Sequence, residues 1–266
     1  MYNDDWERMN HMKTNHRSLS PSDGLWKRYA WILVPIIGLG GLIYPLLGFA
    51  VLAIMVILMV LGMLRGRYWC GNLCPHGSLF DVVLARYLRV KKIPRLFLSP
   101  VFKWSFFAFF MVMFVSRVSG AWQFSGELHF TERLGGVFVM QYLMLPTIGA
   151  VLLAVIFGPR TWCKICPMGT IQTIMHRLGT RLGINKNMDV KLELGDPGGC
   201  RECGACARAC PMQLTPYRDV ELKGFDQECI QCSNCVNNCP FDLLSMGIGG
   251  AEGDGRRHTR EAAAGD

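Results

Sequence analysis

Residues 200–240 read CRECGACARACPMQLTPYRDVELKGFDQECIQCSNCVNNCP and contain eight of the twelve cysteines of the chain. They form two copies of one spacing, C-x2-C-x2-C-x3-C-P, at Cys200, Cys203, Cys206 and Cys210 and again at Cys229, Cys232, Cys235 and Cys239. In such a run three thiolates hold one cluster and the fourth cysteine ligates the other. We therefore predict two 4Fe-4S clusters, one held by Cys200, Cys203, Cys206 and Cys239 and one by Cys229, Cys232, Cys235 and Cys210.

Zinc and disulfides are the competing interpretations of these cysteines. Zinc sites use two separated C-x2-C pairs or mixtures of Cys and His, not three cysteines at successive x2 spacing. Disulfides need an oxidising compartment, which the topology below argues against. The doubled run, together with DQECIQC at 226–232 and PFDLL at 240–244, resembles bacterial two-cluster ferredoxins.

The rest of the chain is too apolar for an ordinary soluble domain. Hydrophobic residues make up 51% of the 266 residues, and the mean hydropathy is +0.24. The stretch 29–64 carries no charge, and as one helix it would be about 54 Å long against a hydrocarbon core of about 30 Å. We therefore predict two spans there, with a turn within 38–48, and two further spans at 101–118 and 137–157, four in all.

The distribution of basic residues predicts the orientation in the membrane. The net charge is +8, and Lys and Arg gather in the arm 1–28, in the loop after the second span and after the fourth span. The loop 119–136, in contrast, carries only Arg133 as a basic residue. Because cytoplasmic loops carry the excess of Lys and Arg, we expect both termini and the ferredoxin domain on the cytoplasmic side of a bacterial inner membrane. The arm lacks the features of a secretory signal peptide.

The remaining four cysteines belong to an internal repeat. Residues 67–79, RYWCGNLCPHGSL, follow the second span, and residues 160–171, RTWCKICPMGTI, follow the fourth. Each continues into a segment with apolar residues at helical spacing: Leu79, Phe80, Val83, Leu84, Tyr87 and Leu88 in the first, and Ile171, Ile174, Met175, Leu178 and Leu182 in the second. Basic residues on the opposite faces predict helices lying in the membrane interface. Two hairpins of one orientation imply a pseudo-twofold axis along the membrane normal, which brings Cys70, Cys74, Cys163 and Cys166 to one cytoplasmic surface.

Four thiolates on one surface suit a third iron-sulfur cluster or another thiophilic metal. They equally suit redox-active dithiols, and a free cysteine is often a small residue of the core. The x2 and x3 spacings, each closed by a proline, favour a redox or metal site. The sequence leaves cluster and dithiol open.

At this point the chain resembles the NapH/NosR-type membrane ferredoxin-type proteins, a family of quinol dehydrogenase subunits. The resemblance rests on the four predicted spans, the two Cys-Pro turns and the C-terminal two-cluster ferredoxin, over residues 25–247. It implies electron exchange between the membrane quinone pool and a respiratory or maturation partner. One departure is that Cys163 and Cys166 are separated by two residues instead of three, which puts the equivalence of the two halves in question.

The predicted fold is a membrane all-α domain joined to a small α+β domain. The membrane domain covers 29–187, with four transmembrane helices in two pseudo-symmetric hairpins and interfacial amphipathic helices. The two-cluster ferredoxin domain covers 188–247. The cytoplasmic arm 1–28 precedes them, and the tail 248–266 is expected to be disordered because it is rich in Gly, Ala and charge.

The preferred function is a membrane-bound electron-transfer subunit between the quinone/quinol pool and a respiratory redox partner protein. Its expected partners are membrane lipid and the protein subunits of a redox complex, not nucleic acid. The sequence identifies no catalytic residues and leaves open whether the chain itself oxidises quinol. The alternative is a maturation factor that supplies electrons or metal to a metalloenzyme. No C-x-x-C-H haem motif and no G-x-G-x-x-G motif occurs.

Four further polar residues are candidates for quinol chemistry. His76 lies inside the first turn, where its ring could donate a hydrogen bond to a cluster sulfur or a quinone oxygen, but we interpret it as a polar residue at the membrane interface. Glu127, His129 and Glu132 suit acceptors of quinol protons, but charged residues in a surface loop need no functional reason. We interpret these three as ordinary solvated residues.

Overall fold

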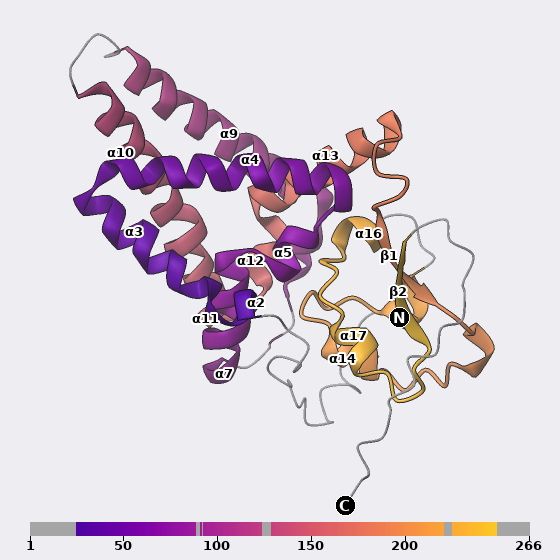
Figure 1. The fold of residues 1–266 in the computed structure, drawn as a ribbon. Coiled ribbons are helices and arrows are strands. Elements are labelled where there is room, and N and C mark those ends of the chain that lie inside the picture. The colour runs from indigo at the N-terminus through magenta and orange to yellow at the C-terminus, as the bar shows by residue number, and fades with distance from the viewer. Residues whose placement is uncertain (1–24, 89–90, 92, 124–128, 221–224, 249–266) are drawn as a thin grey trace, which may run out of the picture.

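The structure is a computed structural model that describes residues 25–88, 91, 93–123, 129–220 and 225–248. A mostly helical part comes first, and a small domain around a two-stranded sheet lies beside it (Figure 1). Most of the predicted arm, the predicted tail from 249 and Glu127 lie outside the described residues.

The helical part is built from short and long helices in alternation. In chain order they are α2 (Leu25–Tyr29), η1 (Ala30–Ile32), α3 (Leu33–Ile43), η2 (Pro45–Leu47), α4 (Gly48–Arg65), α5 (Tyr68–Asn72), α6 (Pro75–Ser78), η3 (Leu79–Leu84), α7 (Ala85–Tyr87), α8 (Arg95–Leu98), α9 (Pro100–Trp122), α10 (Phe130–Tyr142), η4 (Leu143–Gly149), α11 (Ala150–Phe157), α12 (Thr161–Ile165) and α13 (Pro167–Leu182). Here η1 and η2 are 3-10 helices, whereas η3 and η4 are π-helices.

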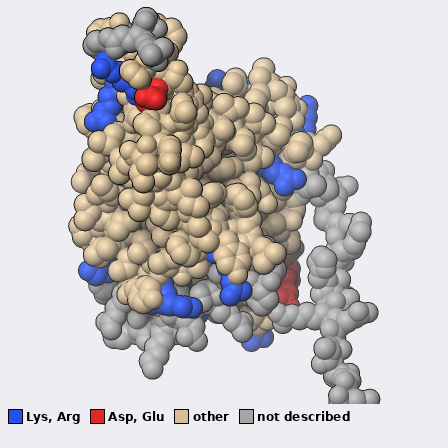
Figure 2. All heavy atoms as spheres, turned by 60° about the vertical axis from the view of Figure 1, so that its left-hand side comes forward, with Lys and Arg blue, Asp and Glu red and all other residues tan. Residues whose placement is uncertain are grey.

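Three of the described helices are long and apolar enough to cross a membrane. They are Pro45–Arg65, Pro100–Trp122 and Phe130–Phe157, with lengths of roughly 32, 35 and 42 Å against a hydrocarbon core of about 30 Å. Each leaves large apolar side chains exposed, among them Val56, Phe109 and Leu152. Figure 2 shows a broad face almost free of charged side chains, with Lys and Arg toward its ends. The chain therefore has the features of a membrane protein.

The first predicted span is shorter than the others. Residues 25–43 divide into α2, η1 and α3, and α3 contains 11 residues. The helix ends because Pro45 cannot continue it, and the backbone turns at Tyr44, within the predicted interval. Gly135 of α10 lies against this turn, since a Cβ there would stand 2.2 Å from the Pro45 carbonyl oxygen. The described residues contain three helices that could span a membrane, and the arrangement of four spans in two hairpins remains a prediction.

The two segments predicted to be interfacial α-helices differ from each other. Residues 79–84 form a π-helix that buries Phe80 completely, whereas Tyr87 is exposed; a π-helix bonds each N–H five residues back, so its side-chain period departs from 3.6. α13 is a regular helix, but it buries the small and polar residues Gly169, Thr170 and Gln172. Small residues permit close packing, and α13 accordingly packs along α4.

The small domain closes on itself through its two ends. β1 (Val190–Leu194) and β2 (Leu244–Ile248) pair antiparallel, with Val190 opposite Ile248 and Leu194 opposite Leu244. Between them lie η5 (Pro197–Gly199), α14 (Ala205–Ala209), α15 (Pro216–Asp219), α16 (Phe225–Glu228) and α17 (Asn234–Asn237). The two cysteine runs therefore occupy loops and short helices held between the strands; the domain boundaries at 188 and 247 stay predictions.

Candidate iron-sulfur and redox site

The eight cysteines of the small domain line two separate pockets. One is lined by Cys210, Cys229, Cys232 and Cys235, and the other by Cys200, Cys203, Cys206 and Cys239. In each pocket three cysteines of one run meet the fourth cysteine of the other run. The structure thus groups the residues in the crossed sets expected from the spacing, while their binding of clusters stays a prediction.

The backbone of the two cysteine runs repeats with an offset of 29 residues. The residues on either side of the second cysteine have positive φ in both runs: Glu202 and Gly204 at 47° and 70°, Gln231 and Ser233 at 53° and 59°. A non-glycine residue in this region costs about 1 kcal/mol or more. The same strain at matching positions indicates a required loop shape, because successive amides that turn inward form a concave anion site of the kind that holds iron-sulfur clusters.

Several thiols in these pockets are shielded from water and lie close to one another. Burial, followed by the neighbouring Cys210, raises the pKa of the Cys232 thiol to about 11. Burial likewise raises the pKa of Cys206 and of Cys210. Thiolates are therefore unfavourable here without a cation, and a bound metal removes this penalty because a coordinating thiol is deprotonated. The chemistry of both sets fits a 4Fe-4S cluster.

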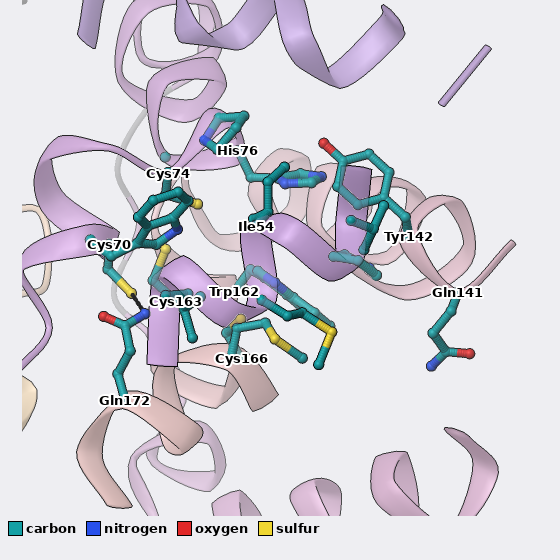
Figure 3. A pocket seen from close by; sticks show the side chains of 18 of the residues that line it. Ile54, Cys70, Cys74, His76, Gln141, Tyr142, Trp162, Cys163, Cys166 and Gln172 are labelled. Carbon is teal, nitrogen blue, oxygen red and sulfur yellow. Dashed lines mark hydrogen bonds between the residues drawn. The ribbon is translucent and has the colours of Figure 1, made fainter. Parts of the chain in front are cut away.

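The other four cysteines meet at a single pocket of the helical part. Cys70, Cys74, Cys163 and Cys166 all line a cavity of about 110 Å³, and Figure 3 shows their sulfur atoms on one side of it. Among the described residues, no three His, Cys, Asp or Glu side chains are placed to hold a single metal ion.

The two turns that carry these cysteines have nearly the same local structure. Cys74 and Cys166 are both extended, with ψ of 122° and 125°, and each is followed by a proline at the start of the next helix. The first turn accommodates its extra residue, Leu73, by a shared hydrogen-bond acceptor: the Leu73 and Cys74 amides both donate to the Trp69 carbonyl. The different spacings therefore produce equivalent turns.

Two buried arginines connect the turns reciprocally. Arg67 Nη2 donates to the carbonyl oxygen of Cys163 at 2.6 Å, and Arg160 Nη1 donates to the carbonyl oxygen of Cys70 at 2.9 Å. Both arginines are at most 3% exposed. Each arginine precedes the first cysteine of its own repeat by three residues, so equivalent arginines of the two repeats make equivalent hydrogen bonds to the opposite turn. It holds together two turns that lie ninety-three residues apart.

The same arginines place positive charge next to the cysteine turns. Arg160 makes a bidentate ion pair with Asp81, at 2.8 and 2.6 Å, and its Nη1 lies 3.6 Å from Cys163 Sγ. Burial lowers the pKa of Arg67, but Cys70 and Glu228 outweigh it and the net pKa is raised. Gln172 Nε2 also donates to Cys70 Sγ at 3.2 Å (Figure 3). Donors and cations next to these sulfurs fit an anionic occupant, such as a thiolate-ligated cluster. Burial raises the pKa of the Cys74, Cys163 and Cys166 thiols, so a free dithiol here is favoured in its protonated form.

The first turn packs directly on the ferredoxin-type domain. A Cβ on Gly71 would stand 2.0 Å from the carbonyl oxygen of Ile230, and Asn72 Nδ2 donates to the carbonyl oxygen of Gln231 at 3.2 Å. Gly71 directly follows Cys70, and Ile230 and Gln231 directly precede Cys232. The two kinds of cysteine site are therefore neighbours.

Glu228 adds an electrostatic contact between the same parts. Its carboxylate lies 2.7 Å from Lys103 Nζ and 3.7 Å from both Arg67 and Lys164, which are buried. Burial raises the pKa of Glu228, but the three cations outweigh it and the net pKa lies below its usual range. One carboxylate next to Cys229 thus ties α9, both cysteine turns and the ferredoxin-type domain together.

His76 is inside the protein, so its interpretation as an interfacial residue is wrong. It is 8% exposed, packs against the Tyr142 ring at an interplanar angle of 60° with centroids 4.8 Å apart, and forms a hydrogen bond with Thr147 Oγ1 at 2.9 Å. Burial lowers the pKa of His76 to about 4. The reason for the difference is that the turn after Cys74 folds against η4 in the third long helix. His129, in contrast, is exposed and pairs with Glu132 at 3.3 Å.

Several residues of the site were not identified from the sequence. Gln141 and Tyr142 line the pocket and are buried, and their side chains have polar atoms that form no hydrogen bond with any described residue. They lie in an apolar helix, where a single polar residue gives no recognisable pattern. Arg67 and Arg160 did carry a signal, since both precede a Trp-Cys pair in the repeat.

Comparisons with known families match both cysteine regions. A family described as a 4Fe-4S binding domain matches residues 47–95 and 140–185, and a 4Fe-4S dicluster domain matches residues 193–240. The first match covers both Cys-Pro turns, and the second covers the doubled run up to Pro240. The chain therefore contains 4Fe-4S ferredoxin-type domains in both parts.

Known relatives are distant. An uncharacterized protein of Methanocaldococcus jannaschii is 28% identical over 72% of this chain and 68% of its own. YccM of Escherichia coli, which carries the name of an electron transport protein, is 25% identical over 78% of this chain and 60% of its own. The methylamine utilization ferredoxin-type protein MauN of Methylobacillus flagellatus is 25% identical over 59% of this chain and 53% of its own. No solved structure matches the chain.

Proposed function

We propose that this protein is a membrane-bound iron-sulfur electron-transfer protein that passes electrons between the quinone pool and a redox partner protein. The observation that carries the proposal is the packing of the four-cysteine pocket directly on the ferredoxin cysteines. The names of YccM and MauN support the same class of function.

Among the described residues, two apolar cores surround the cysteine sites, and Leu214 packs against both. One core contains Cys70 and Cys163 of the membrane part with Cys210 and Cys232 packed against it, and a second core contains Cys206 with Cys229, Cys235 and Cys239 around it. A 4Fe-4S cluster takes up and releases one electron at a time. What the protein supplies is a dry environment, fixed thiols, and buried arginines whose positive charge favours the anionic form of the site.

For the four membrane cysteines we propose a third cluster in preference to a dithiol. Support comes from the match of a 4Fe-4S binding domain over both turns and from the two buried guanidinium groups beside the sulfurs. Iron should approach about twelve atoms per chain and fall by about four in Cys74→Ser, at four irons per cluster. An iron content of about eight in the unaltered protein would show that this site holds no cluster.

The location proposed is a bacterial inner membrane, with both termini and the ferredoxin-type domain in the cytoplasm. Three long apolar helices support a membrane location, and the excess of Lys and Arg supports the orientation. A reporter active only in the periplasm should be silent after Asp266 and active at Gly126. The reverse pattern would place the cysteine sites outside.

The proposal is tested by anaerobic reduction of the purified full chain with a short-chain quinol. The visible absorbance of the clusters should bleach with quinol and with dithionite in the unaltered protein. In Cys74→Ser the quinol response should be lost while the dithionite response remains. A protein that binds iron but never responds to quinol would instead favour the maturation factor.

A further inference from the structure

The pocket of the helical part has two ends of different chemistry. The four cysteines occupy one end, and Figure 3 shows Gln141 on the opposite side of the view from their sulfur atoms. Phe110, Phe114 and Phe138, from the second and third long helices, line its walls. The pocket therefore continues beyond the cysteines into the region between the long helices.

Hydrogen bonds determine which nitrogen of His76 carries the proton. Pro146 has no N–H to donate to the carbonyl oxygen of Tyr142 four residues earlier, and the Thr147 hydroxyl donates to that carbonyl at 2.9 Å. The single hydroxyl proton of Thr147 is therefore engaged in the hydrogen bond to the Tyr142 carbonyl. The Thr147 oxygen lies 2.9 Å from His76 Nε2 and can only accept a hydrogen bond from it. Nε2 therefore carries a proton. No carboxylate of a described residue pairs with the ring, so Nδ1 is the acceptor nitrogen of this tautomer.

This acceptor has no partner within the described part of the chain. No hydrogen bond from a described residue reaches Nδ1 of His76, although the ring is 8% exposed and lines the pocket. Among the described residues, the Tyr142 hydroxyl and both polar atoms of the Gln141 side chain are fully buried and have no hydrogen-bond partner. Unsatisfied buried polar groups cost about 1–3 kcal/mol each, so their presence around one apolar cavity indicates a polar ligand.

We propose that this pocket binds the headgroup of a quinol in its reduced form, with Nδ1 of His76 accepting a hydrogen bond from a ring hydroxyl. The inference rests on the proposed function, in which quinol is the electron donor. A quinone offers only acceptors and leaves Nδ1 unsatisfied, whereas a quinol brings a donor to it. Tyr142 and Gln141 can satisfy the remaining ring oxygens, because a hydroxyl and an amide both donate and accept. His76 and Thr147 are thus positioning residues that select the reduced ring.

Redox-inert probes separate this selection from electron transfer. Isothermal titration calorimetry of the purified full chain in detergent compares tetramethylphenol, which has one hydroxyl donor, with its methyl ether, which has none. One hydrogen bond of about 1.4 kcal/mol corresponds to about tenfold tighter binding of the phenol. In His76→Phe, which keeps an aromatic ring against Tyr142, the preference should fall to less than about twofold.

The Thr147 pair tests the hydrogen-bond direction itself. Thr147→Val removes the hydroxyl at nearly constant volume and frees His76 to place its proton on either nitrogen, so the preference for the phenol should weaken. Thr147→Ser keeps the hydroxyl and should keep the preference. Equal binding of both probes to the unaltered protein, or an undiminished preference in Thr147→Val, overturns the proposal. If His76→Phe does not fold, the Thr147 pair decides.

The outcomes also distinguish this inference from the proposed function. Quinol-dependent bleaching without any preference for the phenol would refute the site and leave the function standing. A preference that depends on His76 and Thr147, without bleaching by quinol, would establish the binding site and refute the electron-transfer function.

Discussion

Gly71→Ala tests whether the membrane part and the ferredoxin-type domain pack as described. The added Cβ would stand 2.0 Å from the carbonyl oxygen of Ile230 and 3.3 Å from the amide nitrogen of Cys232. Both neighbours are backbone atoms, so no side-chain rotation relieves the contact, and the two parts must separate by roughly 1 Å or more. Overpacking of this kind costs about 1–3 kcal/mol, against a gain of about 1 kcal/mol for replacing Gly by Ala in a helix.

Because the clash is with backbone that cannot rotate away, the cost lies in the upper part of this range, about 2–3 kcal/mol, and the expected net loss is about 1–2 kcal/mol. Hydrogen exchange of the amides at 230–233 should speed up by about five- to thirtyfold, because 1.4 kcal/mol corresponds to a factor of ten. Quinol-dependent reduction should slow while reduction by dithionite does not. Gly120→Ala is the matched control, since Gly120 is also helical but has nothing within 4 Å of an added Cβ; it should be neutral or slightly stabilising. If Gly71→Ala behaves like Gly120→Ala, the contact between the two parts is refuted.

Three further predictions concern charge, backbone and ligands. Glu228→Gln leaves the buried Arg67 and Lys164 without their carboxylate and should destabilise the contact by about 2–3 kcal/mol. Breaking a fully buried ion pair costs about 3–5 kcal/mol, and the cost is smaller here because Glu228 is partly exposed. Because the folded-state pKa of Glu228 is lowered, its contribution is present above the unfolded pKa of about 4.3 and is lost as pH falls below it; acid unfolding of Glu228→Gln should lack this step. Ser233→Gly should relieve the left-handed backbone strain and raise the free energy of unfolding by up to about 1 kcal/mol, whereas Gly204→Ala should lower it by a similar amount. If the two substitutions changed the free energy of unfolding in the same direction, the loop geometry would be contradicted. Cys203→Ser should reduce the iron content by about four per chain, and an unchanged content would contradict the ligand set.

Local patterns in the sequence determined the cysteine sites of the small domain. A coordination loop is short, so the spacing of Cys200, Cys203 and Cys206 specifies it without reference to the rest of the fold. The long uncharged runs determined the apolar helices in the same way, because the thickness of the bilayer is a constraint on length and composition alone. The repeated Cys-Pro turns also predicted that Cys70 and Cys163 belong to equivalent places.

Only the tertiary structure decided how these local units meet. Gly71 against Ile230 and the exchange of Arg67 and Arg160 between the turns depend on backbones distant in sequence, which no spacing encodes. His76 looked interfacial because its segment follows a span, but packing against η4 buries it beside Thr147. The tautomer of His76 depends further on Pro146, which leaves the Tyr142 carbonyl without an amide partner four residues on, and on Thr147, whose hydroxyl donates to that carbonyl. Such properties arise from which polar groups remain unsatisfied after packing, and that is decided by long-range contacts and not by local sequence.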